Sequence, residues 1–248
     1  METESSSGEA EAQFANPDDV FKTYANNWYN VSTDYWSKQE QNDNGMLGGY
    51  KDLSGIDIYD TMETIAKYQN PPQKSKLQKM GNENIADCGA GIGRVSHYAL
   101  CEYFTSIDLI DPVGSFLEKA TEIMKDDKVK IRTFVSGIQD WTPDCQYDAF
   151  WVQWAIMYLT DDDAISFLVR CKNHLKPNGY IFVKDNITSK DLKEKKEAAT
   201  FYEEDRGICR AYVHYLELFE KAELRLVEAR KQPGWNEELL PLYTFVLK

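Results

Sequence analysis

A glycine-rich turn constrains this chain more than any other feature. Its glycines are Gly89, Gly91 and Gly93. An apolar run over 84–88 predicts a buried strand before the turn, and a helical pattern follows over 95–103. Because glycine has no Cβ, a ligand can approach such a turn closely and reach the unpaired N–H groups of the helix start. The spacing departs from the dinucleotide fingerprint G-x-G-x-x-G, since the third glycine comes one residue early and Arg94 takes the last place.

A second acidic position strengthens this interpretation. The run 104–110 predicts the next strand and ends in Asp111, which lies 24 residues (111 − 87) after Asp87. A carboxylate at this place accepts hydrogen bonds from a ribose diol. NAD and S-adenosyl-L-methionine (AdoMet) both carry that diol, so Asp111 indicates a nucleoside without choosing between them. The spacing D-x-G-x-G-x-G resembles the first motif of class I AdoMet methyltransferases. A turn without a ligand and an ordinary strand-end acid are the alternatives.

The order of apolar runs predicts an α/β fold. Strands alternate with helices after residue 84, and the bend at 233–234 predicts an antiparallel return near the C-terminus. We therefore expect a doubly wound, mostly parallel, seven-stranded Rossmann-like sheet of the methyltransferase type. Residues 1–16 read as a disordered tail, 17–70 as an N-terminal helical lid, and 71–248 as the AdoMet-dependent domain.

Charge and cysteine content exclude several classes of protein. The formal net charge of −13 argues against a nucleic-acid groove and against an anionic membrane surface, and it favours a cationic partner. Five scattered cysteines and three distant histidines predict neither a disulfide scaffold nor a metal site. No apolar signal segment is visible, so we expect the protein in the cytoplasm and also in the nucleus. We also expect a monomer.

Several segments together resemble the α-N-terminal protein methyltransferases. The most particular are Gly45-Met46-Leu47-Gly48-Gly49-Tyr50 and Gly137-Ile138-Gln139-Asp140-Trp141-Thr142-Pro143, and the shared ones include Gln153-Trp154 and Lys184-Asp185-Asn186. The resemblance covers roughly residues 35–248. It implies transfer of methyl from AdoMet to the terminal amine of proteins that begin X-Pro-Lys, and so a partner protein with an exposed cationic N-terminus.

The resemblance also implies the site residues. The expected AdoMet contacts are Gly89, Gly91, Arg94, Asp111, Pro112, Val113, Ile138, Gln139 and Gln153. The expected substrate contacts are Trp36, Leu47, Trp154, Tyr158 and Asp185, and the expected catalytic residues are Asp205 and Asn186. Arg94 has an independent reason, because a guanidinium pairs well with the methionyl carboxylate. For the tryptophans, plain hydrophobic packing is the alternative.

The peptide half departs from the family pattern. Tyr158 stands where the family has histidine, Tyr202 replaces an aspartate, Gly207 replaces a serine and Leu240 replaces a tyrosine. Two other functions therefore stay open at this point. One is N-methylation of a small molecule, and the other is an AdoMet-binding scaffold with impaired catalysis.

Overall fold

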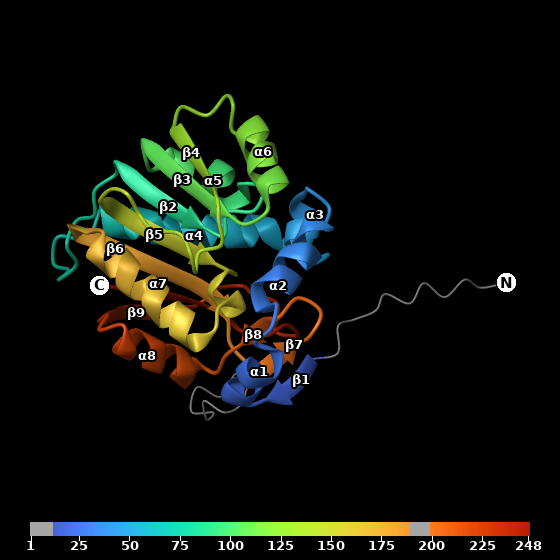
Figure 1. Ribbon diagram of the computed structural model, residues 1–248. Helices are drawn as coiled ribbons and strands as arrows, with labels where there is room; N and C mark the ends of the chain where they lie inside the picture. The colour runs from blue at the N-terminus through green and yellow to red at the C-terminus, as the bar shows by residue number, and fades with distance from the viewer. Residues whose placement is uncertain (1–11, 189–198) are drawn as a thin grey trace.

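A seven-stranded sheet forms the centre of the computed structural model, which describes residues 12–188 and 199–248 (Figure 1). In spatial order its strands are β4 (Lys130–Val135), β3 (Ser106–Asp111), β2 (Asn84–Cys88), β5 (Tyr147–Gln153), β6 (Leu175–Asn186), β10 (Leu242–Leu247) and β9 (Leu226–Lys231). Strands β4 to β6 run parallel, and β10 runs antiparallel to both of its neighbours. The predicted doubly wound sheet with an antiparallel return is confirmed.

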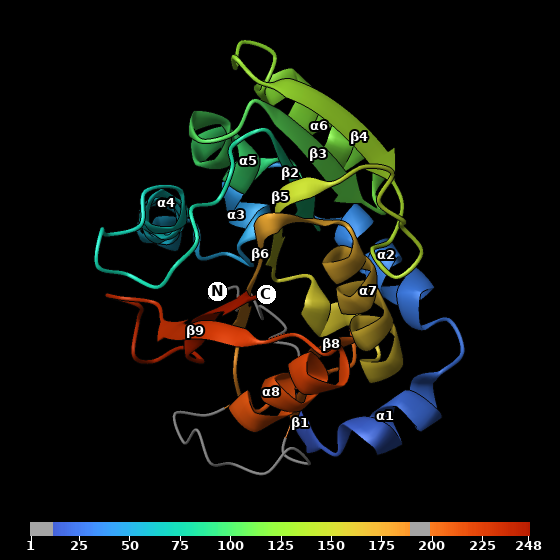
Figure 2. The same cartoon turned by 90° about the vertical axis from the view of Figure 1, so that its left-hand side faces the viewer.

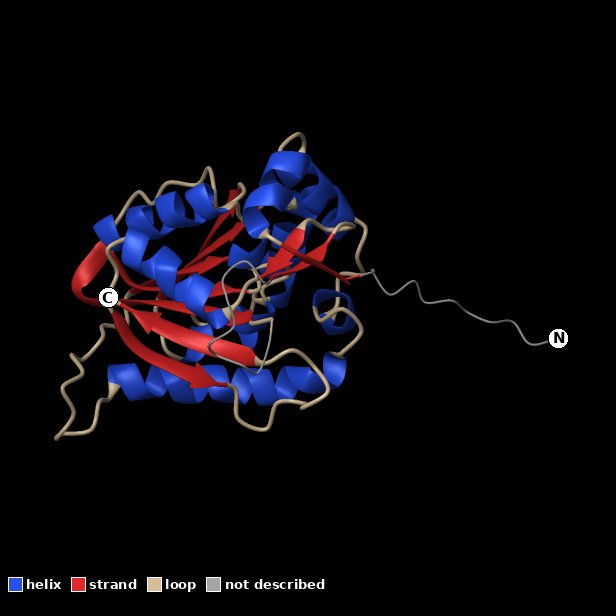
Figure 3. Ribbon diagram, turned by 90° about the horizontal axis from the view of Figure 1, so that it is seen from below, coloured by secondary structure: helices blue, strands red, loops and turns tan. Residues whose placement is uncertain are grey.

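Helices cover both faces of this sheet (Figures 2 and 3). One face packs on α7 (Asp161–Asn173) and α8 (Tyr212–Lys221), and the other on α4 (Ser54–Gln69), α5 (Arg94–Tyr98) and α6 (Gly114–Ile123). Strands covered on both faces are largely apolar, and every residue of β5 is buried, Asp148 and Gln153 included. Within 12–188 and 199–248, no helix has the length and apolar character needed to cross a bilayer.

The N-terminal segment carries one run of apolar residues at helical spacing, but the structure divides this segment into two helices. Helices α1 (Pro17–Tyr24) and α2 (Trp28–Ser37) are separated because Asn27 takes a left-handed conformation with φ 64°. Asn16 caps α1, as its side chain accepts from the Asp18 N–H. The helices bury Val20 and Trp28 against Phe201 and Ile208, residues that follow the main parallel strands in sequence. A short helix α3 (Asp43–Met46) then leads to α4.

A second, three-stranded sheet was not expected. It contains β1 (Ala12–Ala15), β7 (Ala199–Tyr202) and β8 (Gly207–Cys209), all paired antiparallel. Strand β1 falls within the segment 1–16, which we expected to be disordered, and β8 overlaps the start of 208–222, where the apolar spacing of the sequence predicts a helix. Backbone pairing between segments far apart in sequence leaves little local pattern to read. Residues 1–11 and the charged insert 189–197 lie outside the described residues.

Short 3-10 turns complete the fold. They are η1 (Lys51–Leu53), η2 (Leu100–Glu102) and η3 (Ile156–Tyr158). The helix expected over 95–103 is therefore the shorter α5 followed by η2. Helix α7 begins after Thr160, whose side chain accepts from the Asp163 N–H, as the preference for threonine at a helix N-cap predicts.

Replacing Asp161 with asparagine is expected to lower the free energy of unfolding by about 2–3 kcal/mol at neutral pH. Asp161 joins α7 to α8 through His214 Nε2 (2.6 Å) and pairs with Arg210 (2.9 Å). Burial raises the pKa of Asp161, but the His214 hydrogen bond and the Arg210 charge outweigh it and lower the pKa to about 2. A depressed carboxyl pKa stabilises the fold above about pH 4, and this is lost as the pH falls towards the folded-state value.

Urea denaturation between pH 7 and pH 3 checks this expectation. The difference between the wild type and Asp161→Asn should shrink as the pH falls. The matched control is Asp162→Asn, because Asp162 is the exposed neighbour on the same helix turn. An Asp161→Asn deficit that is the same at every pH would contradict the ion-pair explanation.

Candidate active site

A cavity of about 160 Å³ lies at the carboxyl ends of β2, β3 and β5. Parallel strands bring their carboxyl ends to one edge of the sheet, and ligands of open α/β sheets bind there. All nine residues expected to contact AdoMet line this cavity, namely Gly89, Gly91, Arg94, Asp111, Pro112, Val113, Ile138, Gln139 and Gln153. Trp36, Trp154 and Tyr158 line it too. Leu47, Asp185, Asn186 and Asp205 are not part of its lining.

The glycine turn has a backbone that only glycine adopts without strain. Gly89, Gly91 and Gly93 have φ of 84°, 55° and 77°. The space is also limited, because a Cβ on Gly89 would lie 2.5 Å from the Ala155 Cβ. The turn thus brings bare backbone to the cavity wall, as the glycine spacing predicted.

A Gly89→Ala substitution is therefore expected to destabilise the fold and weaken cofactor binding together. A positive φ for an L-residue costs about 1 kcal/mol, and the clash with Ala155 adds to it. The control is Gly55→Ala on α4, where a new Cβ has no neighbour within 4 Å and φ is not positive. Thermal unfolding with and without cofactor measures both effects, and equal behaviour of the two variants would contradict the argument.

Asp111 is fixed by the backbone on two sides of the cavity wall. Its Oδ1 accepts from the Val113 N–H at 2.8 Å, and its Oδ2 accepts from the Gly91 N–H at 2.9 Å. Burial raises the pKa of Asp111 to about 6 against these two hydrogen bonds, so the group is largely ionised at neutral pH. Each oxygen keeps acceptor capacity, because a carboxylate offers about four lone-pair sites.

Arg94 and Gln153 meet at a residue that the sequence did not single out. The Arg94 Nη2 lies 2.6 Å from Asp57 Oδ2, and the Gln153 Nε2 lies 2.9 Å from both Asp57 oxygens. On its other side Asp57 pairs with Lys184 Nζ at 2.6 Å. A signal for this group does exist in the sequence, since polar side chains recur at helical spacing on the buried side of α4. They are Asp57, Asp60, Thr61 and Thr64.

Aromatic side chains form the other end of the cavity. Trp36 of α2 and Tyr158 of η3 meet edge to face, with ring centroids 6.0 Å apart. Trp154 follows β5 in a left-handed conformation with φ 48°, which is strained for a residue with a side chain. Its Nε1 donates to Asn186 Oδ1 at 2.9 Å, and Asn186 Nδ2 donates to the Leu240 carbonyl. Asn186 is thus held against Trp154 at the end of β6.

Asp205 lies behind Tyr158 as seen from the cavity. The Tyr158 hydroxyl donates to Asp205 Oδ2 at 3.1 Å, and the Gly207 N–H donates to Oδ1 at 2.8 Å. Burial raises the pKa of Asp205. Asp185 is fully buried, and burial raises its pKa to about 7. The expected catalytic residues Asn186 and Asp205 therefore contact Trp154 and Tyr158 rather than open space, and Leu47 stays outside the cavity lining.

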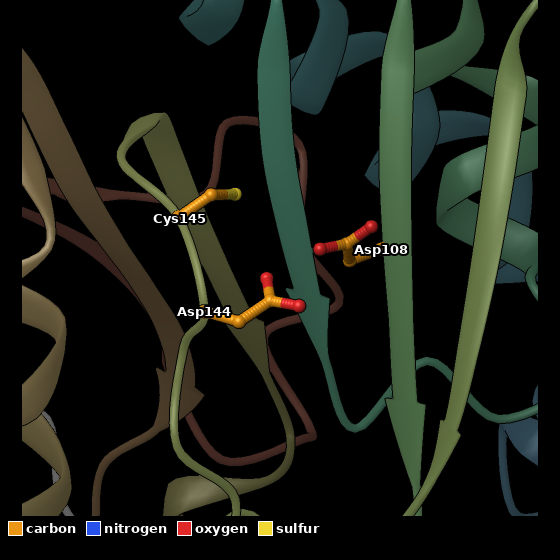
Figure 4. A group of neighbouring side chains, drawn as sticks. All are labelled: Asp108, Asp144 and Cys145. Carbon is orange, nitrogen blue, oxygen red and sulfur yellow. The ribbon is translucent and has the colours of Figure 1, made fainter.

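One further acidic cluster lies away from this cavity. Asp108, Asp144 and Cys145 face one another beside the central strands (Figure 4). Arg132 bridges the two carboxylates, at 2.5 Å from Asp108 and 2.8 Å from Asp144, and Tyr147 also donates to Asp108. The guanidinium already supplies the positive charge that these acids need, so the cluster is explained as an ion-pair network.

Comparisons with known proteins agree on one family. The sequence profile of a family described as AdoMet dependent proline di-methyltransferase matches residues 24–248. The chain is 31% identical over 223 residues to N-terminal Xaa-Pro-Lys N-methyltransferase 1-B of Xenopus laevis, covering 89% of this chain and 95% of that protein. It is 35% identical over 229 residues to alpha N-terminal protein methyltransferase 1 of Dictyostelium discoideum, covering 89% and 79%.

Solved structures show the same fold. An AdoMet-dependent methyltransferase of Leishmania major superposes with a TM-score of 0.82 at 29% identity, over 94% of this chain and 91% of that one. A Haemonchus contortus phosphoethanolamine N-methyltransferase, solved with S-adenosylhomocysteine, superposes with a TM-score of 0.65 at 21% identity over 94% of this chain and 48% of that one. At that identity the second likeness concerns the fold alone.

Proposed function

Because this chain belongs to the family of AdoMet-dependent proline di-methyltransferases, we propose that it methylates the α-amine of proteins that begin X-Pro-Lys. The relatives named for this activity align over 89% of the chain. The observation that carries the proposal is the layout of the cavity. Backbone and polar groups suited to a nucleoside line one end, and two tryptophans form the other, with the buried Asp185 and the half-buried Asp205 behind them.

The chemistry of the cavity wall fits AdoMet. Asp111 has acceptor capacity for a ribose diol, and Arg94 has N–H groups for the methionyl carboxylate. Ile138 and Gln139 stand on the loop that follows β4, where they suit the adenine. When bound, AdoMet supplies a methyl group on a sulfonium, which an amine lone pair can accept.

The proposed contribution of the peptide end is orientation and proton acceptance. An α-amine has a pKa of about 8, so removing its proton at neutral pH costs little. Asp205 is the proposed acceptor, and Asn186 Oδ1 keeps a lone pair for the amine besides the one that Trp154 uses. Trp36 and Trp154 are the proposed walls for the proline ring. A negative Asp205 also raises the amine pKa, so holding the nucleophile in line is a large part of its proposed role.

The test is a methyl-transfer assay with an X-Pro-Lys peptide, read by mass spectrometry of the intact peptide. The expected result is methylation that acetylation of the α-amine abolishes, because the acetylated nitrogen has no available lone pair. Equal methylation of the acetylated peptide would place the target on a side chain. Cofactor binding without methylation of any X-Pro-Lys peptide would favour the impaired scaffold, and turnover only of a free amine would favour a small-molecule enzyme.

A further inference from the structure

The cavity residues Arg94 and Gln153 depend on a charged group that lies outside the cavity. Asp57 is fully buried on α4, and it does not line the cavity itself. Its carboxylate accepts from Arg94 Nη2 and from Gln153 Nε2, as described above. These two side chains come from different segments, the start of α5 and the end of β5. One carboxylate therefore sets the orientation of both.

Ion pairs hold the Asp57 carboxylate in place and keep it ionised. Lys184 is fully buried on β6 and pairs with Asp57 Oδ1, and it also approaches Asp60 at 3.3 Å. Arg230 holds Asp60 from the outer side at 2.5 Å. Burial alone would raise the pKa of Asp57, but the Lys184 and Arg94 charges outweigh it and lower the pKa. Asp57 thus stays ionised, with α4 and β6 both anchoring it.

Arg94 connects this network to the cavity. Its ion pairs join Arg94 and Lys184 to Asp57, and Lys184 and Arg230 to Asp60, and the Arg94 charge also acts on the buried carboxyl group of Asp87. Arg94 is the cation that lines the cavity. Asp57 and Ser54 each accept from one of the five N–H groups of the guanidinium, so a carboxylate placed against Arg94 can accept charge-assisted hydrogen bonds from the others. The amino-acid end of AdoMet carries such a carboxylate.

We propose that Asp57 is a positioning residue for the cofactor, holding Arg94 and Gln153 in the orientation in which they receive the amino-acid end of AdoMet. The adenosine end does not depend on Asp57, because Asp111, Ile138 and Gln139 are held by other contacts. The two ends of the ligand should therefore respond differently to loss of the Asp57 charge. This inference concerns the cofactor alone and does not need the peptide substrate.

The test compares two ligands by calorimetry on the full-length protein. S-adenosylhomocysteine carries the amino-acid end, whereas 5′-methylthioadenosine keeps the adenosine and the sulfur without it. In Asp57→Asn we expect the Kd of S-adenosylhomocysteine to rise about tenfold or more, and the Kd of 5′-methylthioadenosine to change less than about threefold. The control is Asp60→Asn, which removes a charge from the same network without touching Arg94 or Gln153 and should change neither Kd by more than about threefold.

A second variant covers the case in which Asp57→Asn does not fold. Combining Asp57→Asn with Lys184→Met removes one anion and one cation, so the network keeps its net charge and its burial cost falls. The selective loss of S-adenosylhomocysteine affinity should persist, since the single amide oxygen of asparagine cannot replace the carboxylate that accepts from both Arg94 and Gln153. The positioning role would be overturned if Asp57→Asn weakened the binding of both ligands equally or left the Kd of S-adenosylhomocysteine unchanged. It would also be overturned if Asp60→Asn weakened S-adenosylhomocysteine binding as much as Asp57→Asn does. If the wild-type protein binds neither ligand, both the positioning role of Asp57 and the assignment of AdoMet as cofactor are overturned.

Discussion

An Asp111→Ala variant is expected to bind AdoMet about 100-fold more weakly than the wild type. Hydrogen bonds to a charged group contribute about 1.5–3 kcal/mol each, and the ribose diol can donate two to this carboxylate. The substitution also leaves the Gly91 and Val113 N–H groups without their acceptor, so the glycine turn loses one of its ties to β3. Calorimetric titration with AdoMet and with S-adenosylhomocysteine measures the loss.

Two controls isolate the role of the Asp111 charge. Asp162→Ala removes an exposed acid on α7 and should leave the Kd unchanged. Asp111→Asn keeps the shape but places an NH₂ group against either the Gly91 or the Val113 N–H, so it should also bind weakly. A Kd within about threefold of wild type in Asp111→Ala would remove the ribose contact from the proposed site.

An Asp205→Asn variant is expected to lower kcat by about 100-fold while KM for the peptide changes little. An amide cannot accept the proton of the amine, but its shape preserves the contacts with Tyr158 and the Gly207 backbone. Burial raises the pKa of Asp205, and only the ionised carboxylate can act, so wild-type kcat should fall as the pH drops through that raised value. Steady-state kinetics across pH with an X-Pro-Lys peptide provide the measurement.

Tyr158→Phe tests the same role of Asp205 as proton acceptor, by changing the pKa of the carboxyl group instead of removing it. The Tyr158 hydrogen bond lowers the pKa of Asp205, so its removal should raise that pKa and move the acid limb of the kcat profile to higher pH. At alkaline pH the variant should recover most of its kcat, whereas Asp205→Asn should not. An acid limb that stays in place in Tyr158→Phe would separate Asp205 from the rate-limiting proton transfer.

The cofactor half of the site was predictable because its determinants are local in sequence. The turn at Gly89 and Gly91 needs a backbone that only glycine adopts, and Asp111 closes a strand whose apolar run marks its end. Right-handed parallel connections then bring these strand ends to one edge of the sheet. The glycine spacing and the strand-end acid therefore predicted a nucleoside site at this edge from local pattern, whereas the family resemblance supplied the full set of nine cavity residues.

The remaining features depend on contacts between distant segments. Asp57 reads as one more charged residue on an amphipathic helix, and only the packed structure turns it toward Arg94 and Lys184. Strand β8 was expected to be helical because Ile208 continues the apolar spacing of α8, yet pairing with β7 determines its conformation. Tertiary contacts outweigh local propensity at such positions.

The pairing of β1 with β7 sets an order of events during synthesis of the chain. Ala15 pairs with Ala199, so 184 residues (199 − 15) separate the partners. A ribosome adding about 5–20 residues per second needs roughly 10–40 s to supply the second strand after the first has emerged. Phe201, the packing partner of Trp28, is likewise synthesised 173 residues (201 − 28) after it. The beginning of the polypeptide is therefore among the last parts to reach its final place, and its apolar helices stay open to chaperones until then.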